Sequence, residues 1–332
     1  MKIVIAGAGS IGCYCGALLA DAGHEVTLLG RSRVLEPIRE QGLTVTNYAG
    51  LHRHLPAQKL TLGDDPECLG GADAIIVTVK SGATPEMAGL IAIHAAQGVP
   101  VLSWQNGMQN AQTLREALPG YDVRAGMVPF NVVPIEPATY HCATSGDIVV
   151  QTGPGNLAER LNSPNLPISA SDQIEAVQWG KLVINLNNAL NALSGLTLVD
   201  QLMDRQWRCL MADQMAEALN VLKAASKPVA STTPLPASLT PFILRLPTPI
   251  FMRVASKMLT IDPTARTSMA YDLMQGRKTE VDSLQGEIKR LAEQTGMNTP
   301  ICARVSDLIQ QRPTPPMRPQ EIRPDAKVIG GR

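Results

Sequence analysis

Six residues near the N-terminus have the types and spacing of a phosphate-binding loop. They directly follow the β-branched run Ile3–Ala6 and open a helix-compatible stretch, and they are Gly7, Ala8, Gly9, Ser10, Ile11 and Gly12. In such a loop the first glycine makes a tight turn, the second lets the backbone approach a pyrophosphate, and the third lets helix pack on strand. The N-terminus of the helix then faces the anion. We expect a dinucleotide to bind here; the alternative is a glycine-rich turn that holds no ligand.

The residues after the second expected strand bear on which dinucleotide binds. A protein that prefers NAD usually has Asp or Glu there to hold the ribose hydroxyls, whereas this chain has Arg31, Ser32 and Arg33. Guanidinium groups and a hydroxyl suit a ribose 2′-phosphate, because arginine gives charge-assisted and often bidentate hydrogen bonds. The sequence therefore favours NADPH, against the alternative of two solvated arginines in a loop.

Two further polar residues follow expected strands. Lys80 ends the run Asp73–Lys80, and Asn106 follows the run Val99–Trp104. In open α/β sheets, ligands bind at the carboxyl ends of parallel strands. We expect both side chains at such an edge; the alternatives are a surface charge for Lys80 and an ordinary turn for Asn106.

The stretch Trp179–Leu193 predicts an apolar helix with one polar strip. At about 100° per residue, Lys181, Asn185 and Asn188 fall in a narrow sector. A helix that is apolar over much of its circumference is typically buried, and a buried lysine is either paired or has a lowered pKa. Either state suits a proton donor. The alternative is a structural asparagine network between helices.

A second polar feature lies near the C-terminus, where residues 264–296 are expected to form one long helix. On that helix Glu280 shares its sector with Met269, Leu273, Leu284 and Leu291, and Ser268 and Asp272 lie one turn apart. A carboxylate in an apolar stripe costs several kcal/mol unless it finds a cation or a donor. Lys181 is a candidate partner; the alternative is a structural bridge to another Arg or Lys.

The pattern of the elements predicts an α/β chain of two domains. Strands are expected over 3–6, 25–29, 73–80 and 99–104, and helices over 11–22 and 85–97. Apolar strands that alternate with helices indicate a parallel sheet covered on both faces. Residues 123–133 and 139–151 are expected to extend that sheet or to form a hairpin at its edge. We assign 1–170 to this domain and 171–311 to a helical domain with a Pro-rich insertion at 226–263 and a last helix at 300–311, followed by a poorly ordered tail at 312–332.

Composition excludes several classes of partner. Lys and Arg number 29 and Asp and Glu number 29 in 332 residues, so the formal net charge is zero, and aromatic residues make up 3%. Nucleic-acid-binding proteins typically show a basic excess and stacking platforms. No apolar run reaches the roughly 18 residues that cross a bilayer. We expect a small-molecule ligand, no nucleic acid and no membrane.

The cysteines and the N-terminus indicate a reducing compartment. The six cysteines are scattered with no CxxC pair, so we expect neither a metal site nor a disulfide framework. Residues 2–22 superficially resemble a signal peptide, but four glycines break the apolar run and it opens with a strand. We therefore expect a cytoplasmic protein.

Taken together, these motifs resemble the ketopantoate reductase (2-dehydropantoate 2-reductase) family from Lys2 to about Leu308. The motifs GAGSIG, VTVKS, QNGMQN and WGKLVINLNNALNAL and the Ser268/Glu280 pair stand in the family's order and at similar spacing. The resemblance implies an N-terminal Rossmann-type domain and an all-α C-terminal domain like that of 6-phosphogluconate dehydrogenase. It also implies NADPH-dependent reduction of the 2-oxo group of 2-dehydropantoate to (R)-pantoate, a step in pantothenate synthesis.

The resemblance also implies roles for individual residues. Lys181 would be the general acid, and Glu280 would orient the lysine or a substrate hydroxyl from a place close to the cofactor. The substrate would be bound by Asn106, Asn185, Asn188 and Ser268. The NADPH would be bound by the loop Gly7 to Gly12 and by Arg31, Lys80, Asn106 and Glu280.

One departure from the family pattern concerns the substrate. The family helix commonly has a second asparagine where this chain has Ala189, and the adjacent Asn188 lies nearer the Lys181 face and can take its place. The departure bears more on which 2-oxo acid is reduced than on the reaction type. The alternatives are a reductase of a different 2-oxo acid and a non-catalytic NADPH-binding sensor. The apolar helical domain makes a homodimer plausible.

Overall fold

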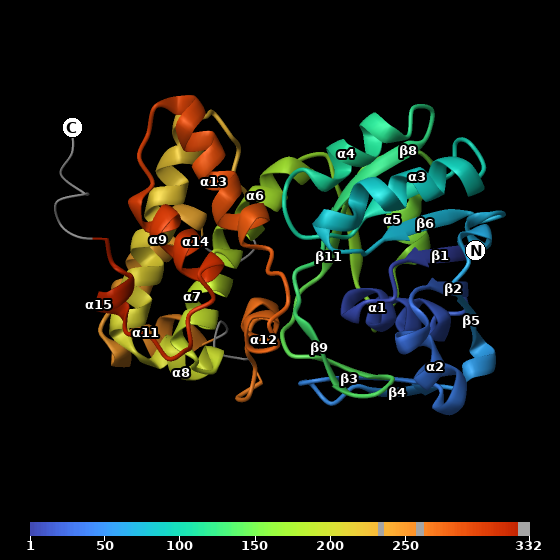
Figure 1. The fold of residues 1–332 in the computed structure, drawn as a ribbon, viewed down its shortest axis with the longest axis horizontal. Helices are drawn as coiled ribbons and strands as arrows, with labels where there is room; N and C mark the ends of the chain where they lie inside the picture. The colour runs from blue at the N-terminus through green and yellow to red at the C-terminus, as the bar shows by residue number, and fades with distance from the viewer. Residues whose placement is uncertain (232–235, 257–261, 325–332) are drawn as a thin grey trace. The chain divides into compact units, whose positions relative to one another are not determined.

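The computed structural model describes residues 1–231, 236–256 and 262–324. It divides into two compact units, Met1–Ile174 and Glu175–Arg332 (Figure 1). The first unit holds the strands, and the second, in the part of it that is described, is helical. This confirms the expected fold class.

An eight-stranded sheet forms the centre of the first unit. Its order is β12 (Ile168–Ser171), β11 (Ile148–Gln151), β8 (Asp122–Met127), β7 (Pro100–Ser103), β6 (Ala74–Val77), β1 (Lys2–Ala6), β2 (Glu25–Leu29) and β5 (Leu60–Gly63). The six strands from β8 to β5 in this order are parallel, β11 runs antiparallel to β8, and β12 is parallel to β11. The predicted parallel sheet is thus confirmed.

Helices cover both faces of this sheet. Side chains of each strand alternate between the faces, so an apolar strand needs packing partners on both sides. On one face Ile3 and Ile5 pack in a core with α1 (Ser10–Asp21), and with α5 (Leu157–Leu161). On the other face Val4 and Ala6 pack with α3 (Thr84–His94) and α4 (Asn110–Ala117). The apolar β1 strand is therefore buried on both sides, as its sequence predicts.

A second, four-stranded sheet was not predicted. Its order is β4 (His52–Leu55), β3 (Leu43–Asn47), β10 (Thr139–Cys142) and β9 (Val132–Glu136). The expected edge hairpin is therefore wrong in part: β8 and β11 extend the main sheet, but the β9–β10 hairpin pairs with β3 instead. The physical reason is burial, because Val45 and Tyr140 belong to the core that covers α1. The sequence reading also missed β5 and α2 (Ser32–Gln41).

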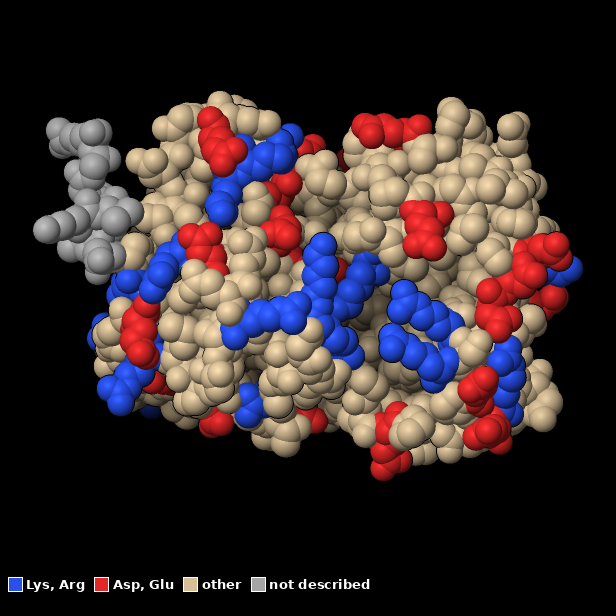
Figure 2. Space-filling model, viewed as in Figure 1, with Lys and Arg blue, Asp and Glu red and all other residues tan. Residues whose placement is uncertain are grey.

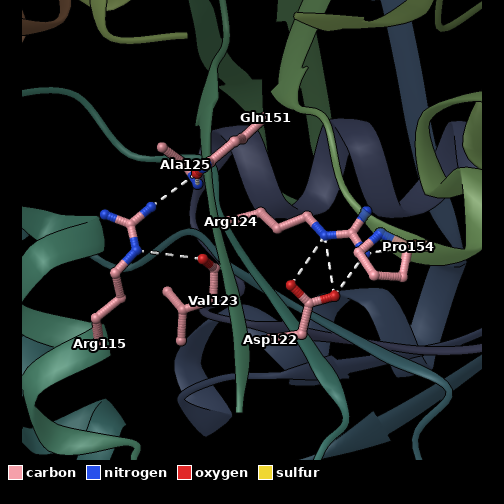
Figure 3. Close-up of polar contacts among 7 residues, drawn as sticks. All are labelled: Arg115, Asp122, Val123, Arg124, Ala125, Gln151 and Pro154. Carbon is pink, nitrogen blue, oxygen red and sulfur yellow. Dashed lines mark hydrogen bonds and ion pairs between the residues drawn. The ribbon is translucent and has the colours of Figure 1, made fainter. Parts of the chain in front are cut away.

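A buried arginine on β8 binds residues near the junction of β8 with β11 (Figure 3). Arg124 on β8 is 3% exposed, its Nε lies 3.0 Å from Asp122 Oδ2, and its Nη2 donates to the Pro154 carbonyl. Arg115 on α4 donates to Gln151 Oε1 on β11 at 2.7 Å (Figure 3). The Arg124 bond to Pro154 fastens the chain that follows β11 to β8, and the Arg115 bond fastens β11 to α4. Both lie near the antiparallel pairing of β8 with β11.

The described part of the second unit consists of helices. They are α6 (Ile174–Asn185), α7 (Asn187–Ser194), α8 (Leu198–Met203), α9 (Arg205–Ala224), α10 (Thr240–Arg245), α11 (Thr248–Val254), α12 (Ser268–Met274), α13 (Val281–Thr295), α14 (Pro300–Gln310) and α15 (Pro319–Ile322). Leucines of α7 and α13, such as Leu190 and Leu284, are buried as the apolar periodicity predicts.

The single long helix expected over 264–296 is wrong. Helix α12 ends at Met274, and α13 starts only at Val281. Gly276 has φ +64°, a left-handed conformation that glycine adopts without strain, and the Arg277 N–H bonds back to the Asp272 carbonyl at 2.8 Å. The predicted apolar sector that joined Glu280 to Met269 therefore does not exist, and Glu280 directly precedes α13.

The Pro-rich segment and the tail are held by specific contacts. Arg208 on α9 is 1% exposed, and it donates to the Leu244 and Leu246 carbonyls at 3.0 and 2.9 Å and lies over the Phe251 ring. Of the expected insertion, residues 232–235 and 257–261 lie outside the described residues. Poor order was expected for 312–332, but Ile322 is fully buried; residues 325–332 lie outside the described part.

On the face drawn in Figure 2, many acidic side chains lie directly beside basic ones, and uncharged areas stand between these groups. Within the described ranges, no helix is long and apolar enough to cross a membrane. The exposed large apolar side chains include Phe242 on α10 and Ile250 on α11.

Candidate active site

The glycine loop has the close packing that its sequence predicts. A Cβ on Gly7, whose φ is +125°, would lie 2.7 Å from the Val79 nitrogen, and one on Gly12 would lie 2.2 Å from the Gly7 carbonyl oxygen. Both positions therefore require glycine. Gly9 is exposed, and a Cβ there would meet nothing within 4 Å. The loop is thus tight toward the sheet and open at Gly9.

Backbone bonds fasten this loop to the neighbouring strands. The Ala8 N–H donates to the Leu29 carbonyl at 2.8 Å, and the Thr78 hydroxyl donates to the Gly7 carbonyl at 2.6 Å. The first N–H groups of a helix have no partner within the helix, and in α1 these belong to Ser10, Ile11 and Gly12. The N-cap is Gly9, which has no side chain to satisfy them. These N–H groups could therefore hold an anionic ligand.

The residues after β2 lie beside an acidic group that the sequence reading missed. Arg31 is exposed and precedes the first turn of α2, and the Ser32 hydroxyl donates to Asp64 Oδ2 at 3.1 Å. Asp64 follows β5, whose Gly63 pairs with Leu29. Because β5 was not predicted, no pattern in the sequence placed Asp64 next to Ser32.

A buried polar network joins the ends of β6 and β7, where Lys80 and Asn106 were expected. The Ser81 hydroxyl and the Asn110 Nδ2 both donate to the Asn106 carbonyl, at 3.1 and 2.7 Å. Gln105 Nε2 donates to the Val79 carbonyl at 2.8 Å. Lys80 is exposed, between Val79 and Ser81, so the network holds its backbone near that of Asn106. The structure therefore brings Lys80 and Asn106 to one edge of the sheet.

The network also contains residues that the sequence reading did not single out. Gln105 Nε2 bonds Thr84 Oγ1 at 2.8 Å, and the Thr84 hydroxyl donates to Asn110 Oδ1 at 2.9 Å. Both Thr84 and Asn110 are buried. Thr84 and Asn110 orient the backbone at Asn106. The sequence features that could have identified them are the QNGMQN segment, which ends at Asn110, and the start of α3, which is Thr84.

Lys181 and Asn185 lie one turn apart on α6. The Lys181 side chain is half-buried, and burial lowers its pKa from 10.5 to about 8. Removal from water penalises the charged form of an amine, which is the cause of the shift. Asn185 is 7% exposed. This pair has the properties of an amine that gives up a proton near neutral pH beside a buried amide.

A structural asparagine network exists, but other asparagines form it. Asn187 and Asn191 on α7 are buried, and each donates from Nδ2 to Gln201 Oε1, at 3.2 and 3.1 Å. Asn191 Oδ1 accepts from the Thr267 backbone N–H at 3.0 Å. The alternative interpretation, a structural asparagine network between helices, thus applies to this face of α7, which is distinct from the expected Lys181 strip.

Thr267 brings Ser268 to the helix that carries Asn188. Its hydroxyl donates to the Asn188 carbonyl at 3.1 Å and accepts from the Ala270 N–H at 3.3 Å. Ser268 is the first residue of α12, so this cap fixes its backbone beside α7. Asp272, one turn later, is buried and pairs with Arg277 at 2.9 Å.

Glu280 is half-buried and occupies the N-cap position of α13. Within the described residues, no group of three or more His, Cys, Asp or Glu is placed to hold a metal ion. The six cysteines are free thiols.

Comparison with known proteins decides the family. The model "Ketopantoate reductase PanE/ApbA" matches residues 3–155, and "Ketopantoate reductase PanE/ApbA C terminal" matches residues 173–312. The chain belongs to the ketopantoate reductase family. This confirms the resemblance seen in the motifs, and it makes the chain an oxidoreductase.

Individual relatives agree with this assignment. The 2-dehydropantoate 2-reductase of Halobacterium salinarum is 26% identical over 318 residues, 93% of this chain and 98% of that protein. The crystal structure of a PanE/ApbA family ketopantoate reductase from Ralstonia eutropha JMP134 has a TM-score of 0.79 and 29% identity, covering 94% of this chain and 98% of that one. A D-mandelate dehydrogenase with NADH and anilino(oxo)acetate has a TM-score of 0.76 at 22% identity, over 97% and 99% of the two chains. That last likeness is one of fold.

Proposed function

We propose that this chain reduces the 2-oxo group of 2-dehydropantoate to give (R)-pantoate, with NADPH as the reductant. The observation that carries the proposal is the half-buried Lys181, whose pKa is lowered to about 8 by burial, one turn from the buried Asn185. Within a family of ketopantoate reductases, such an amine suits a general acid.

The residues of the first unit fit a dinucleotide. The open N-terminus of α1 at Gly9 would hold the pyrophosphate, Arg31 would bind the ribose 2′-phosphate, and Lys80 and Asn106 would contact the cofactor. When bound, the reduced nicotinamide supplies the hydride. NADH is the competing cofactor, because it is named with the D-mandelate dehydrogenase of similar fold.

The residues of the second unit would handle the proton and the substrate. As negative charge develops on the former carbonyl oxygen, the Lys181 ammonium stabilises it and donates its proton to that oxygen. Asn185, Asn188 and Ser268 would bind the substrate's polar groups. Glu280 would orient the lysine or a substrate hydroxyl.

A second candidate is the reduction of a different 2-oxo acid. Ala189, which stands where the family commonly has asparagine, is fully buried, while the adjacent Asn188 is half-buried. The amide on this part of α7 is therefore displaced by one position, about 100° around the helix. Such a change alters the polar groups offered to a substrate without touching Lys181.

Turnover of a substrate panel tests both candidates. NADPH oxidation would be followed with 2-dehydropantoate, with unbranched aliphatic 2-oxo acids and with aromatic 2-oxo acids, using the full chain. The highest kcat/KM for 2-dehydropantoate is the expected result, and a higher value for another acid would favour the second candidate. NADPH binding without turnover of any acid would instead indicate a sensor. Light scattering on the same sample checks the expected homodimer.

A further inference from the structure

The helix that carries the polar strip is interrupted at Leu186. Helix α6 ends at Asn185 and α7 starts at Asn187, although Leu186 itself keeps helical angles of φ −56° and ψ −28°. The Leu186 N–H still bonds the Leu182 carbonyl at 3.0 Å. The interruption therefore falls between Asn185 and Asn188, two members of the expected strip.

A side chain from another helix binds at this interruption. Gln285 on α13 donates from Nε2 to the Leu186 carbonyl at 2.8 Å, and it is wholly buried. Its Oε1 is also buried and makes no hydrogen bond to the described residues. A buried acceptor left without a partner costs about 1–3 kcal/mol. An apolar side chain could fill the same volume without leaving a buried oxygen unpaired. What the Gln285 amide contributes is therefore its hydrogen bond to the Leu186 carbonyl.

The position of this bond gives it a consequence for the site. The Leu186 carbonyl stands at the N-cap of α7, and a carbonyl oxygen has two lone pairs, so it can accept the Gln285 amide in addition to a backbone N–H. The Gln285 bond therefore ties the junction of α6 and α7 to α13. Lys181 and Asn185 precede the interruption, whereas Asn188 follows it and is bonded through its carbonyl to Thr267. A change at Leu186 therefore moves one set of polar groups relative to the other.

We propose that Gln285 is a positioning residue, whose bond to the Leu186 carbonyl sets how Asn188 and Ser268 lie relative to Lys181 and Asn185. The proposal rests on the proposed function, because it concerns the substrate side of the same site. Gln285 itself touches neither substrate nor cofactor in this account. It acts through the backbone of α7.

The first test removes the donor while keeping the side-chain length. Gln285→Met is expected to lower kcat/KM for 2-dehydropantoate by about 10-fold or more, because small misplacements of reacting groups are costly. The NADPH Kd, measured by fluorescence without turnover, stays within about twofold. The matched control is Gln214→Met, since Gln214 on α9 is equally buried but neither its Nε2 nor its Oε1 makes a hydrogen bond to the described residues. Equal kinetics for the two variants would overturn the proposal.

A second variant separates positioning from simple filling of space. Gln285→Glu keeps the length, and a buried carboxyl favours its neutral form, which can donate to the Leu186 carbonyl. Its kcat/KM should approach the wild-type value at low pH and fall as the carboxyl ionises, which adds a limb to the pH profile. A profile with the same limbs as wild type would contradict the proposal. This variant also serves if Gln285→Met fails to fold.

Failure of the proposed function can be told apart from failure of the positioning role of Gln285. If the wild-type chain does not reduce 2-dehydropantoate, that function fails by itself, and hydrogen exchange then tests the positioning role. Exchange in peptides covering residues 182–191 should change in Gln285→Met and not in Gln214→Met. Unchanged exchange in both variants would overturn the role of Gln285.

Discussion

The Thr267 hydroxyl donates to the Asn188 carbonyl at 3.1 Å, and so one side chain joins the start of α12 to the first turn of α7. The same oxygen accepts the Ala270 N–H and caps α12. The Thr267 backbone N–H meanwhile bonds Asn191. Three bonds from one residue thus fix where Ser268, the next residue, stands relative to the asparagines.

Replacing Thr267 should affect both stability and substrate binding. Thr267→Val removes the cap and the bond to Asn188, and we expect a loss of about 1 kcal/mol in the free energy of unfolding. The KM for the 2-oxo acid should rise several-fold while the NADPH Kd is unchanged. The control is Thr197→Val, because Thr197 caps α8 by accepting the Asp200 N–H at 3.1 Å. It should lose similar stability with normal KM; a raised KM in both variants would contradict the assignment.

Lys181 is expected to be the proton donor. Lys181→Met should lower kcat by at least about 10²-fold, the lower end of general acid catalysis, and leave NADPH binding intact. Lys223→Met, which removes an exposed lysine in the last turn of α9, is the control. A kcat for Lys181→Met near that of the control would reject the role.

The lowered pKa of Lys181 predicts a pH dependence. The amine can donate only while it is protonated, and burial brings its pKa to about 8. Activity is therefore fully present only well below this pH, is halved at the pKa, and kcat/KM should fall about tenfold per pH unit well above it. A lysine with the ordinary pKa of 10.5 would keep its activity to a pH about 2.5 units higher. A profile of kcat/KM against pH measures this limb, which should vanish from the residual activity of Lys181→Met.

The glycine loop shows how much of a site the sequence can predict. Local rules sufficed there, because the turn, the tight packing of Gly12 and the start of α1 all depend on neighbouring residues. The strand β2 was predicted with its observed bounds, Glu25–Leu29, for the same reason. Lys80 and Asn106 were placed correctly at one sheet edge because parallel strands end there together.

Contacts between distant segments were not predictable in this way. The pairing of β10 with β3 joins residues about a hundred positions apart, and Thr139 and Thr44 carry no signal of it. The polar contact of Ser32 with Asp64 depends on the unpredicted strand β5. The break at Gly276 was missed because the apolar period continues across it. A periodic pattern of apolar residues gives no sign of a single residue with left-handed backbone angles.

Arg31 should discriminate between the two nicotinamide cofactors. Arg31→Gln removes the guanidinium expected at the ribose 2′-phosphate, and a lost hydrogen bond to a charged group costs about 1.5–3 kcal/mol. The KM for NADPH should rise at least about tenfold, while that for NADH changes little. Arg39→Gln, at the other end of α2, is the control. Equal effects on both cofactors would place Arg31 away from the phosphate.

The ion pair of buried Arg124 with Asp122 on β8 should contribute far more to stability than a surface pair. Arg124 has a side chain that is 4% exposed, and Asp122→Asn would leave its charge without a carboxylate (Figure 3). Removing one member of a buried pair is strongly destabilising. Because Asp122 is itself 34% exposed and the Pro154 carbonyl remains as an acceptor, we expect a loss of about 2–3 kcal/mol in the free energy of unfolding. Urea denaturation measures it.

The control for this prediction is an ion pair of similar chemistry that lies in solvent. Arg53 and Asp21 are 3.2 Å apart, with side chains 47% and 35% exposed. Exposed pairs contribute at most about 1 kcal/mol because water and salt screen them, so Asp21→Asn should have a small effect that added salt reduces further. The effect of Asp122→Asn should persist in salt, since Arg124 stays buried. Equal losses for the two variants would show that burial of Arg124 adds nothing to the stability of the β8–β11 edge.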